Sequence, residues 1–130
     1  MKNMDKVLVI DDKEDIRSVL KDMLNMSGYE VDTAADGKSA KELYDKNEYA
    51  AVITDIIIMQ GQNGFDIILD FRNKNQLDRV IAISGGGRTS SEDYLSIAKN
   101  FGVTSIFSKP PNYKDLIAKV DEIVQSHKQA

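Results

Sequence analysis

The sequence predicts an α/β protein built on a doubly wound, five-stranded parallel sheet with helices on both faces. Short β-branched runs alternate with segments of helical apolar spacing from one end of the chain to the other, which is typical of repeated strand–helix units. The 130 residues, 42% of them hydrophobic, suffice for one compact domain and are too few for two ordinary ones. We therefore expect a single domain over residues 5–125 and a C-terminal tail over residues 126–130.

Five runs are expected to form the strands. They are Val7–Ile10, Tyr29–Ala34, Ala51–Thr54, Val80–Ser84 and Val103–Phe107. The first, third and fourth are continuously apolar, as strands are when helices cover both faces, whereas the second alternates and the fifth is diluted by polar residues. The second and fifth are therefore the expected edges. With right-handed crossovers, helices on both faces require the order 2-1-3-4-5, in which the winding reverses between the first and third strands.

A helix is expected after each strand. In the first helix, apolar residues share one face, Gly28 follows at the position of a left-handed C-cap, and Asp36 is expected to cap the second helix. The apolar positions are Ile16, Val19, Leu20, Met23 and Leu24 in the first helix, Ala40, Leu43 and Tyr44 in the second, Phe65, Ile68 and Phe71 in the third, Tyr94, Ile97, Ala98 and Phe101 in the fourth, and Leu116, Val120, Ile123 and Val124 in the fifth.

Composition excludes several kinds of chemistry. The absence of cysteine excludes a disulfide framework, cysteine-ligated zinc, an iron–sulfur cluster and a thiol nucleophile. The one histidine, His127, lies near the C-terminus, so histidine-based catalysis is not expected. Lys and Arg number 17 and Asp and Glu 21, and the resulting charge of −4 argues against a surface for nucleic acid or anionic membrane. Carboxylate, lysine and hydroxyl chemistry remain.

No membrane-spanning segment is expected. The longest apolar stretch, Ala50–Met59, is half the ~20 residues that span a bilayer and contains Asp55. The residues before Val7 lack the apolar core of a signal peptide. We therefore expect a cytoplasmic location.

Polar side chains stand at the carboxyl ends of four predicted strands. They are Asp11 and Asp12 after the first strand, Asp55 after the third, Ser84 at the end of the fourth and Lys109 after the fifth. The carboxyl ends of parallel strands share one edge of the sheet, and doubly wound sheets bind ligands at that edge, where the winding reverses. The coincidence of these residues predicts a site there.

Each of these residues alone also has a plain structural explanation. Asp11 and Asp12 could cap the first helix, and Asp55 could cap the turn that follows it. Asp55, however, precedes three isoleucines, and a carboxylate among apolar residues costs several kcal/mol unless it is paired or bound to a metal. If the first and third strands are neighbours, the three carboxylates converge. Mg²⁺ then fits best, because it accepts a few carboxylates and retains waters that a phosphate can replace.

The remaining two residues extend this site. Lys109 could be an ordinary surface lysine, but two prolines follow it and fix the backbone that carries it. Ser84 could simply end its strand, and the three glycines after it could form a flexible turn. Beside a cation, an ammonium group, a hydroxyl and bare glycine amides form a site suited to a phosphoryl group.

Four segments together resemble the receiver domain of two-component response regulators. They are Val7–Asp12, Val52–Asp55, Ala82–Gly85 and Phe107–Pro110. The resemblance covers nearly the whole chain, about residues 5–125. It implies the flavodoxin-like receiver fold and phosphorelay signal transduction, in a signalling domain that is not an enzyme although it assists its own phosphorylation and slow dephosphorylation.

The resemblance also implies a role for each residue at this edge. Asp55 would be the phosphoacceptor for a histidine kinase or a histidine phosphotransfer protein. Asp12 would bind Mg²⁺ directly and Asp11 largely through water, and the carbonyl of Ile57 would complete the protein ligands. Lys109 would contact the phosphoryl oxygens.

Three residues would form a switch by the same resemblance. Ser84 would hydrogen-bond the phosphoryl group, the Phe107 ring would turn inward when Ser84 moves, and Pro110 would follow a cis peptide bond. Taken alone, Phe107 reads as a core residue. The output would be a surface for a downstream protein target, and a phosphorylation-linked homodimer is left open.

The loop after Asp55 departs from the family pattern. The family usually has Met at the third position after the phosphoacceptor, Pro at the fourth and Gly at the eighth, whereas here Met59 is fourth and Gly64 is ninth. This spacing corresponds to one inserted residue and a lost proline, so the loop is expected to differ locally. Pro111 also stands where an aromatic residue is common.

Three other functions compete with phosphoacceptance. A degenerate receiver would act as an unphosphorylated docking module, and the altered loop is the main argument for it. A hydrolase of the aspartyl-phosphate type would usually have a second acid two residues after the nucleophile, where this chain has Ile57. A flavin or nucleotide carrier would usually show a glycine-rich phosphate loop after the first strand, but Gly85–Arg88 follows the fourth.

We predict slow self-dephosphorylation. The residues two positions after Asp55 and Ser84 are Ile57 and Gly86, and neither side chain can orient a water molecule for hydrolysis. Phosphorylated protein kept alone with Mg²⁺ and followed by intact mass should therefore retain its phosphoryl group for many minutes. A half-life of seconds would contradict the prediction.

Overall fold

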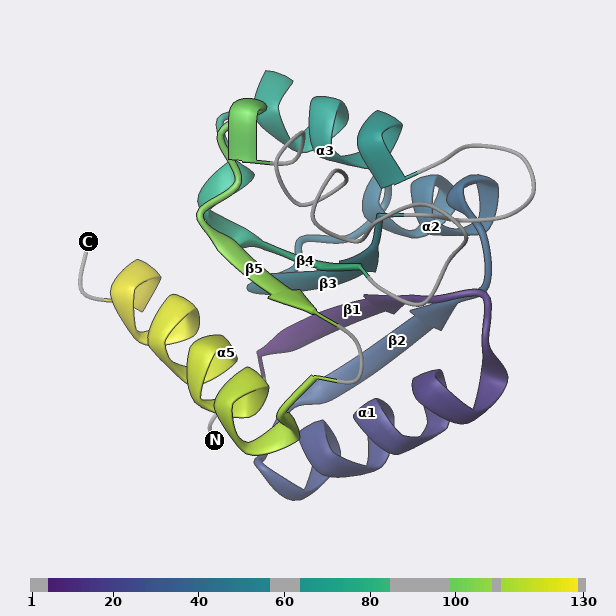
Figure 1. The fold of residues 1–130 in the computed structure, drawn as a ribbon, viewed down its shortest axis with the longest axis vertical. Coiled ribbons are helices and arrows are strands. Elements are labelled where there is room, and N and C mark those ends of the chain that lie inside the picture. Colours follow the sequence, from purple (N-terminus) through teal and green to yellow (C-terminus); the bar gives the residue numbers. More distant parts are fainter. Residues whose placement is uncertain (1–4, 57–63, 85–98, 109–110, 129–130) are drawn as a thin grey trace.

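The computed structural model describes residues 5–56, 64–84, 99–108 and 111–128, and its strands form one parallel sheet (Figure 1). The strands are β1 (Lys6–Ile10), β2 (Glu30–Ala34), β3 (Ala51–Asp55), β4 (Val80–Ser84) and β5 (Ser105–Ser108). Their order is β2-β1-β3-β4-β5, which confirms the predicted order. The winding therefore reverses between β1 and β3, the position where doubly wound sheets bind ligands.

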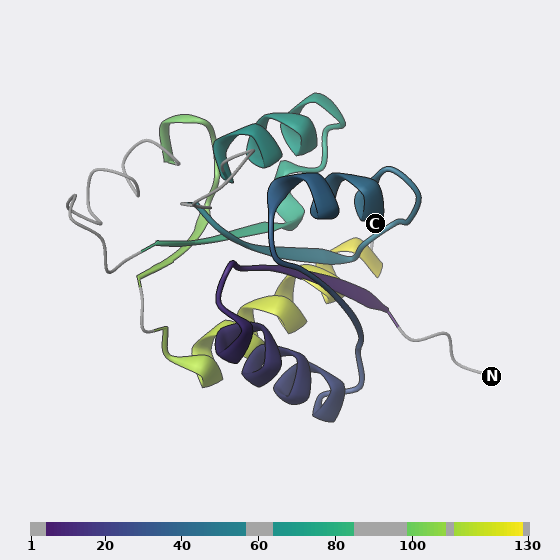
Figure 2. The ribbon, with the colours of Figure 1, turned by 90° about the vertical axis from the view of Figure 1, so that its right-hand side faces the viewer.

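Helices cover both faces of the sheet (Figures 1 and 2). They are α1 (Glu14–Met26), α2 (Gly37–Tyr44), α3 (Gly64–Asn73) and α5 (Tyr113–Lys128), with a short 3-10 turn, η1 (Leu77–Arg79), before β4. α1 and α5 lie on one face, and α2 and α3 lie on the other. The predicted fourth helix, with Tyr94, Ile97 and Ala98, falls mostly outside the described residues.

Two apolar layers follow from the alternation of side chains along each strand. In β1, Val7 and Val9 belong to the layer beneath α1 and α5, whereas Leu8 and Ile10 belong to the layer beneath α2 and α3. All four are at most 1% exposed. A strand buried on both faces has no room for polar side chains except where the chain leaves the sheet. This confirms that β1, with β3 and β4, forms the centre of the sheet.

The predicted helix ends are observed. Gly28 has a φ of 97°, and the amide of Tyr29 donates to the carbonyl of Leu24 at 3.1 Å, which is the six-to-one bond of a Schellman motif. Asp36 caps α2 by accepting a hydrogen bond from the Ser39 amide at 2.7 Å. This bond stabilises the ionised form of Asp36 and lowers the pKa of its carboxyl group below 3.8.

Three sequence expectations differ from the structure. β5 begins at Ser105, not Val103, because the chain turns at Gly102, whose φ is 104°, and the first residue paired with β4 is Ser105. Val19 is 42% exposed, because α1 packs over the edge strand β2 and its neighbour β1, so the layer beneath it is narrow. Residues 126–128, expected in a tail, continue α5.

Among the described residues, no helix combines the length and the apolar character that crossing a membrane requires.

One hydrogen bond between α2 and α3 provides a test of this packing. Tyr44 is 4% exposed, its ring lies 4.9 Å from that of Phe71, and its hydroxyl donates to the Asp70 carboxylate. Tyr44→Phe keeps the ring and removes the bond, so the free energy of unfolding in urea should fall by about 1–2 kcal/mol at neutral pH. Tyr113→Phe is the control, since the Tyr113 hydroxyl makes no hydrogen bond to another described residue.

The same contribution should depend on pH. Burial, followed by the bond to Asp70, raises the pKa of Tyr44 well above 10.0. The folded protein therefore keeps a proton that the unfolded chain releases, so the stabilisation is full below pH 10 and falls as the pH rises further. A difference between wild type and Tyr44→Phe that grows above pH 10 would contradict this reading.

Candidate functional site

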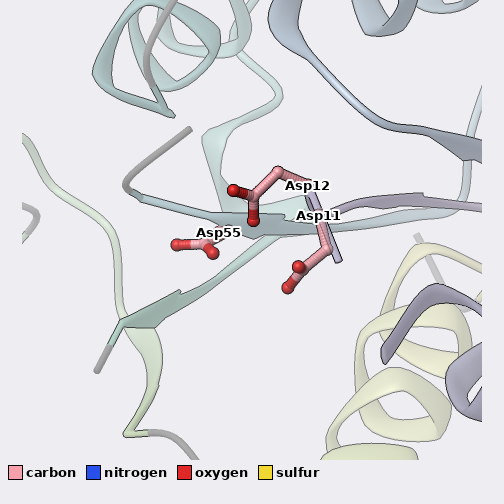
Figure 3. Close-up of side chains that lie close together, drawn as sticks. All are labelled: Asp11, Asp12 and Asp55. Atoms are coloured by element: carbon pink, nitrogen blue, oxygen red, sulfur yellow. The ribbon is translucent and has the colours of Figure 1, made fainter. Parts of the chain in front are cut away.

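Three carboxylates meet at the carboxyl edge of the sheet, at the point where the winding reverses (Figure 3). Asp11 and Asp12 follow β1 directly, and Asp55 is the last residue of β3. One oxygen from each carboxylate lies within 4.8 Å of the others. The convergence expected from the sequence is thus present in the structure.

Strand register explains this meeting. Ile10 of β1 is paired with Thr54 of β3, so Asp11 and Asp55 are the next positions on two neighbouring strands. Asp55 is also paired with Ile83 of β4, and the amide of Ile56 donates to the Ile83 carbonyl at 2.9 Å. Asp55 is therefore held between the two strands that flank β3.

Two of the three carboxylates are buried, which adds a desolvation cost to the cluster. Asp11 is 2% exposed and Asp55 is 7% exposed, whereas Asp12 is partly open to solvent. Buried carboxylates keep their charge only when hydrogen bonds, an opposite charge or a metal ion compensate for lost hydration. Asp12 is thus the most exposed of the three carboxylates.

Neither Asp11 nor Asp12 is the N-cap of α1. α1 begins at Glu14 with Lys13 at its N-cap, and no side chain accepts a capping hydrogen bond there. Asp11 instead accepts a bond from the Lys13 amide at 2.9 Å through Oδ1, which tightens the turn between β1 and α1. Helix capping, the plain explanation for Asp11 and Asp12, is therefore excluded.

The other expected site residues are only partly described. Ser84 ends β4 one residue after Ile83, so its backbone lies at the same edge as Asp55, and it is paired with Ser108 of β5. Phe107 is half-buried and packs against the apolar layer beneath α1 and α5. Three expected residues lie outside the described ranges: Ile57, Lys109 and Pro110.

The donor set fits Mg²⁺. This ion binds oxygens at ~2.1 Å, usually through one or two carboxylates and several waters. Oxygens on opposite sides of the ion are thus ~4.2 Å apart, so oxygens within 4.8 Å of one another need only small shifts to share it. Ca²⁺ binds oxygens at the longer distance of ~2.3–2.6 Å, usually with more protein ligands than this cluster supplies, whereas Mg²⁺ keeps several of its waters.

Sequence reasoning missed one residue beside this site. Arg17 lies in the first turn of α1, and its Nη1 donates to the main-chain carbonyl of Asp11 at 2.7 Å. The available signal was an arginine in the first turn of the helix that follows the acidic pair, within side-chain reach of the preceding turn.

Fold and site together define the class: a doubly wound α/β protein with a cation-type acidic cluster at the reversal of its winding. Comparison with known families is more specific. The profile of the response regulator receiver domain family matches residues 7–121. The chain belongs to this family of two-component signalling domains.

Known relatives agree with this assignment. The chain is 28% identical over 122 residues to the transcriptional regulatory protein CpxR of Klebsiella pneumoniae subsp. pneumoniae (strain HS11286), covering 94% of this chain and 50% of CpxR. It therefore spans about half the length of the curated relatives it matches.

Solved receiver structures are also similar. The structure of a response regulator receiver domain protein from Clostridium thermocellum has a TM-score of 0.84 at 26% identity, with 97% of this chain and 98% of that one covered. Chemotaxis response regulator CheY4 of Vibrio cholerae has a TM-score of 0.75 at 30% identity, with 93% and 99% covered.

Binding of Mg²⁺ should stabilise the fold through this cluster. Added Mg²⁺ should raise the midpoint of thermal unfolding, because a ligand of the folded state alone shifts the equilibrium toward it. Asp12→Asn should remove most of that rise. Without Mg²⁺ the variant should be at least as stable as wild type, since one of three mutually repelling charges is gone.

Asp22→Asn is the matched control, because Asp22 is exposed on α1 and lies outside the cluster. It should respond to Mg²⁺ as wild type does. An equal response in Asp12→Asn would show that the cation binds elsewhere.

Proposed function

We propose that this receiver accepts a phosphoryl group on Asp55 from a phosphohistidine of a histidine kinase or histidine phosphotransfer protein, in a Mg²⁺-dependent reaction. The observation that carries the proposal is the position of Asp55 at the end of central strand β3, within 4.8 Å of the other two carboxylates. Family membership supports the same chemistry.

Strand order favours Asp55 over its two neighbours as the acceptor. β3 lies between β1, which leads into Asp11 and Asp12, and β4, which ends at Ser84. A phosphoryl group on Asp55 would thus have the cation ligands on one side. On the other side it would have the strand ends that carry Ser84 and lead into Lys109.

The transfer balances without further reactants. A carboxylate oxygen of Asp55 attacks phosphorus, the phosphorus–nitrogen bond of the phosphohistidine breaks, and the leaving imidazole takes up a proton. Asp12 directly, Asp11 largely through water and the Ile57 carbonyl would hold the ion, which when bound neutralises charge on the transferred oxygens. Lys109 would contact the same oxygens from the opposite side.

The proposed output is conformational. A phosphoryl group that gains a hydrogen bond from Ser84 would bias the β4 end of the sheet, and β5 is its direct neighbour. Phe107 would report this change, because it is paired with Ile83 and only half-buried. Pro110, after a cis peptide bond, would shape the turn beyond β5.

The proposed downstream partner is a protein. Curated relatives such as CpxR are named transcriptional regulators, and this chain spans about half their length. A net charge of −4 favours contact with protein rather than with nucleic acid or membrane. Because kinases draw on ATP, the proposal places the reaction in the cytoplasm.

Incubation with a small acyl phosphate and Mg²⁺, followed by intact mass, tests the acceptor. Wild type should gain one phosphoryl group, and Asp55→Asn should gain none, because the amide is not a nucleophile of this kind. Asp22→Asn, exposed on α1, should behave as wild type. Removal of Mg²⁺ with a chelator should suppress the gain. A wild type that gains nothing would instead favour an unphosphorylated docking module.

A further inference from the structure

Arg17 is bound to the turn that carries two of the three carboxylates. Its Nη1 donates to the carbonyl oxygen of Asp11 at 2.7 Å, and the contact is partly buried. This carbonyl belongs to the peptide group that joins Asp11 to Asp12. The orientation of that peptide plane sets the direction in which the chain turns into Asp12.

Two further polar atoms of Asp11 also make hydrogen bonds. The Asp11 amide donates to the carbonyl of Ala34, at the end of β2, at 3.1 Å. Asp11 Oδ1 accepts the bond from the Lys13 amide at 2.9 Å. The turn is thus held to β2 by the Asp11 amide and to α1 by the Asp11 carbonyl, and the carbonyl bond can be removed by substituting Arg17 without changing either acidic residue.

We propose that Arg17 is a positioning residue for the divalent-cation site: by holding the Asp11–Asp12 peptide it fixes the carboxylates in the arrangement that binds the ion. The inference rests on the Mg²⁺ site of the proposed function. Groups that orient metal ligands typically contribute ~10–100-fold to metal affinity, because a pre-oriented ligand set loses less conformational freedom on binding.

The charge of Arg17 acts in the opposite direction. A guanidinium group near the site repels a cation, so on charge alone its removal would tighten Mg²⁺ binding. The bond at 2.7 Å is made to a neutral carbonyl and orients the main chain. Orientation and repulsion therefore predict opposite signs, which makes the two roles separable.

Two substitutions distinguish these roles. Arg17→Met removes both the charge and the donor while keeping an unbranched side chain. Arg17→Lys keeps the positive charge but replaces the planar guanidinium group with a compact ammonium group on a shorter side chain. The matched control is Lys21→Met, which removes a positive charge from an exposed position one turn further along α1.

The measurement is a Mg²⁺ titration followed by backbone amide chemical shifts, with the thermal midpoint of each variant recorded without Mg²⁺. The half-saturating Mg²⁺ concentration should rise about tenfold in Arg17→Met and by a smaller factor in Arg17→Lys. It should change less than about twofold in Lys21→Met. Should Arg17→Met fail to fold, Arg17→Lys still provides the comparison.

Unchanged or tighter Mg²⁺ binding in the Arg17 variants would overturn the inference. A lower thermal midpoint with unchanged Mg²⁺ affinity would do the same, since it would assign Arg17 a purely structural role. These results leave the proposed function standing as long as wild type binds the ion. A wild type that shows no Mg²⁺-dependent shifts would overturn the metal site itself, and the inference with it.

Discussion

The three carboxylates of Asp11, Asp12 and Asp55 repel one another, and the rest of the fold must hold them together against this repulsion. Their oxygens lie within 4.8 Å of one another, and two of the three residues are buried. At an effective dielectric constant of ~20, a pair of like charges at this separation repels by about 3 kcal/mol. A flexible chain would relieve that repulsion by moving apart. The cluster therefore requires rigid supports, and β1 and β3 in the centre of the sheet provide them.

The same central position explains why chemistry is confined to one edge. Side chains of β1 alternate between two apolar layers, so every position within the strand is used for packing. A polar side chain inside β3 is possible only where it is satisfied locally, as for Thr54, whose hydroxyl bonds to the Asp55 carbonyl. Charged residues can appear only where the strand ends, which is why register alone brings Asp11 beside Asp55.

Strand order and the acidic cluster were predictable because continuous apolar runs identify central strands and register follows from parallel pairing. Features that depend on contacts formed only in the folded chain could not be predicted in this way. The exposure of Val19 reflects how far the sheet extends beneath α1, which periodicity does not encode. Arg17 bonds to the main-chain carbonyl of Asp11. Because every residue has such a carbonyl, the sequence does not show which one accepts a side-chain hydrogen bond. The start of β5 depends on where β4 offers its first partner.

Three tyrosine hydroxyls make long-range hydrogen bonds to aspartates away from the acidic edge. Tyr29, which precedes β2, bonds to Asp121 of α5, and Tyr49, which precedes β3, bonds to Asp32 at 2.7 Å. Tyr44, the last residue of α2, bonds to Asp70. These tyrosine hydroxyls connect helices and strands near the amino edge of the sheet, and each bond contributes about 1–2 kcal/mol to stability. The proposed change of charge at Asp55 would therefore be accommodated at the carboxyl edge, where Ser84 and Ser108 are paired at the ends of β4 and β5.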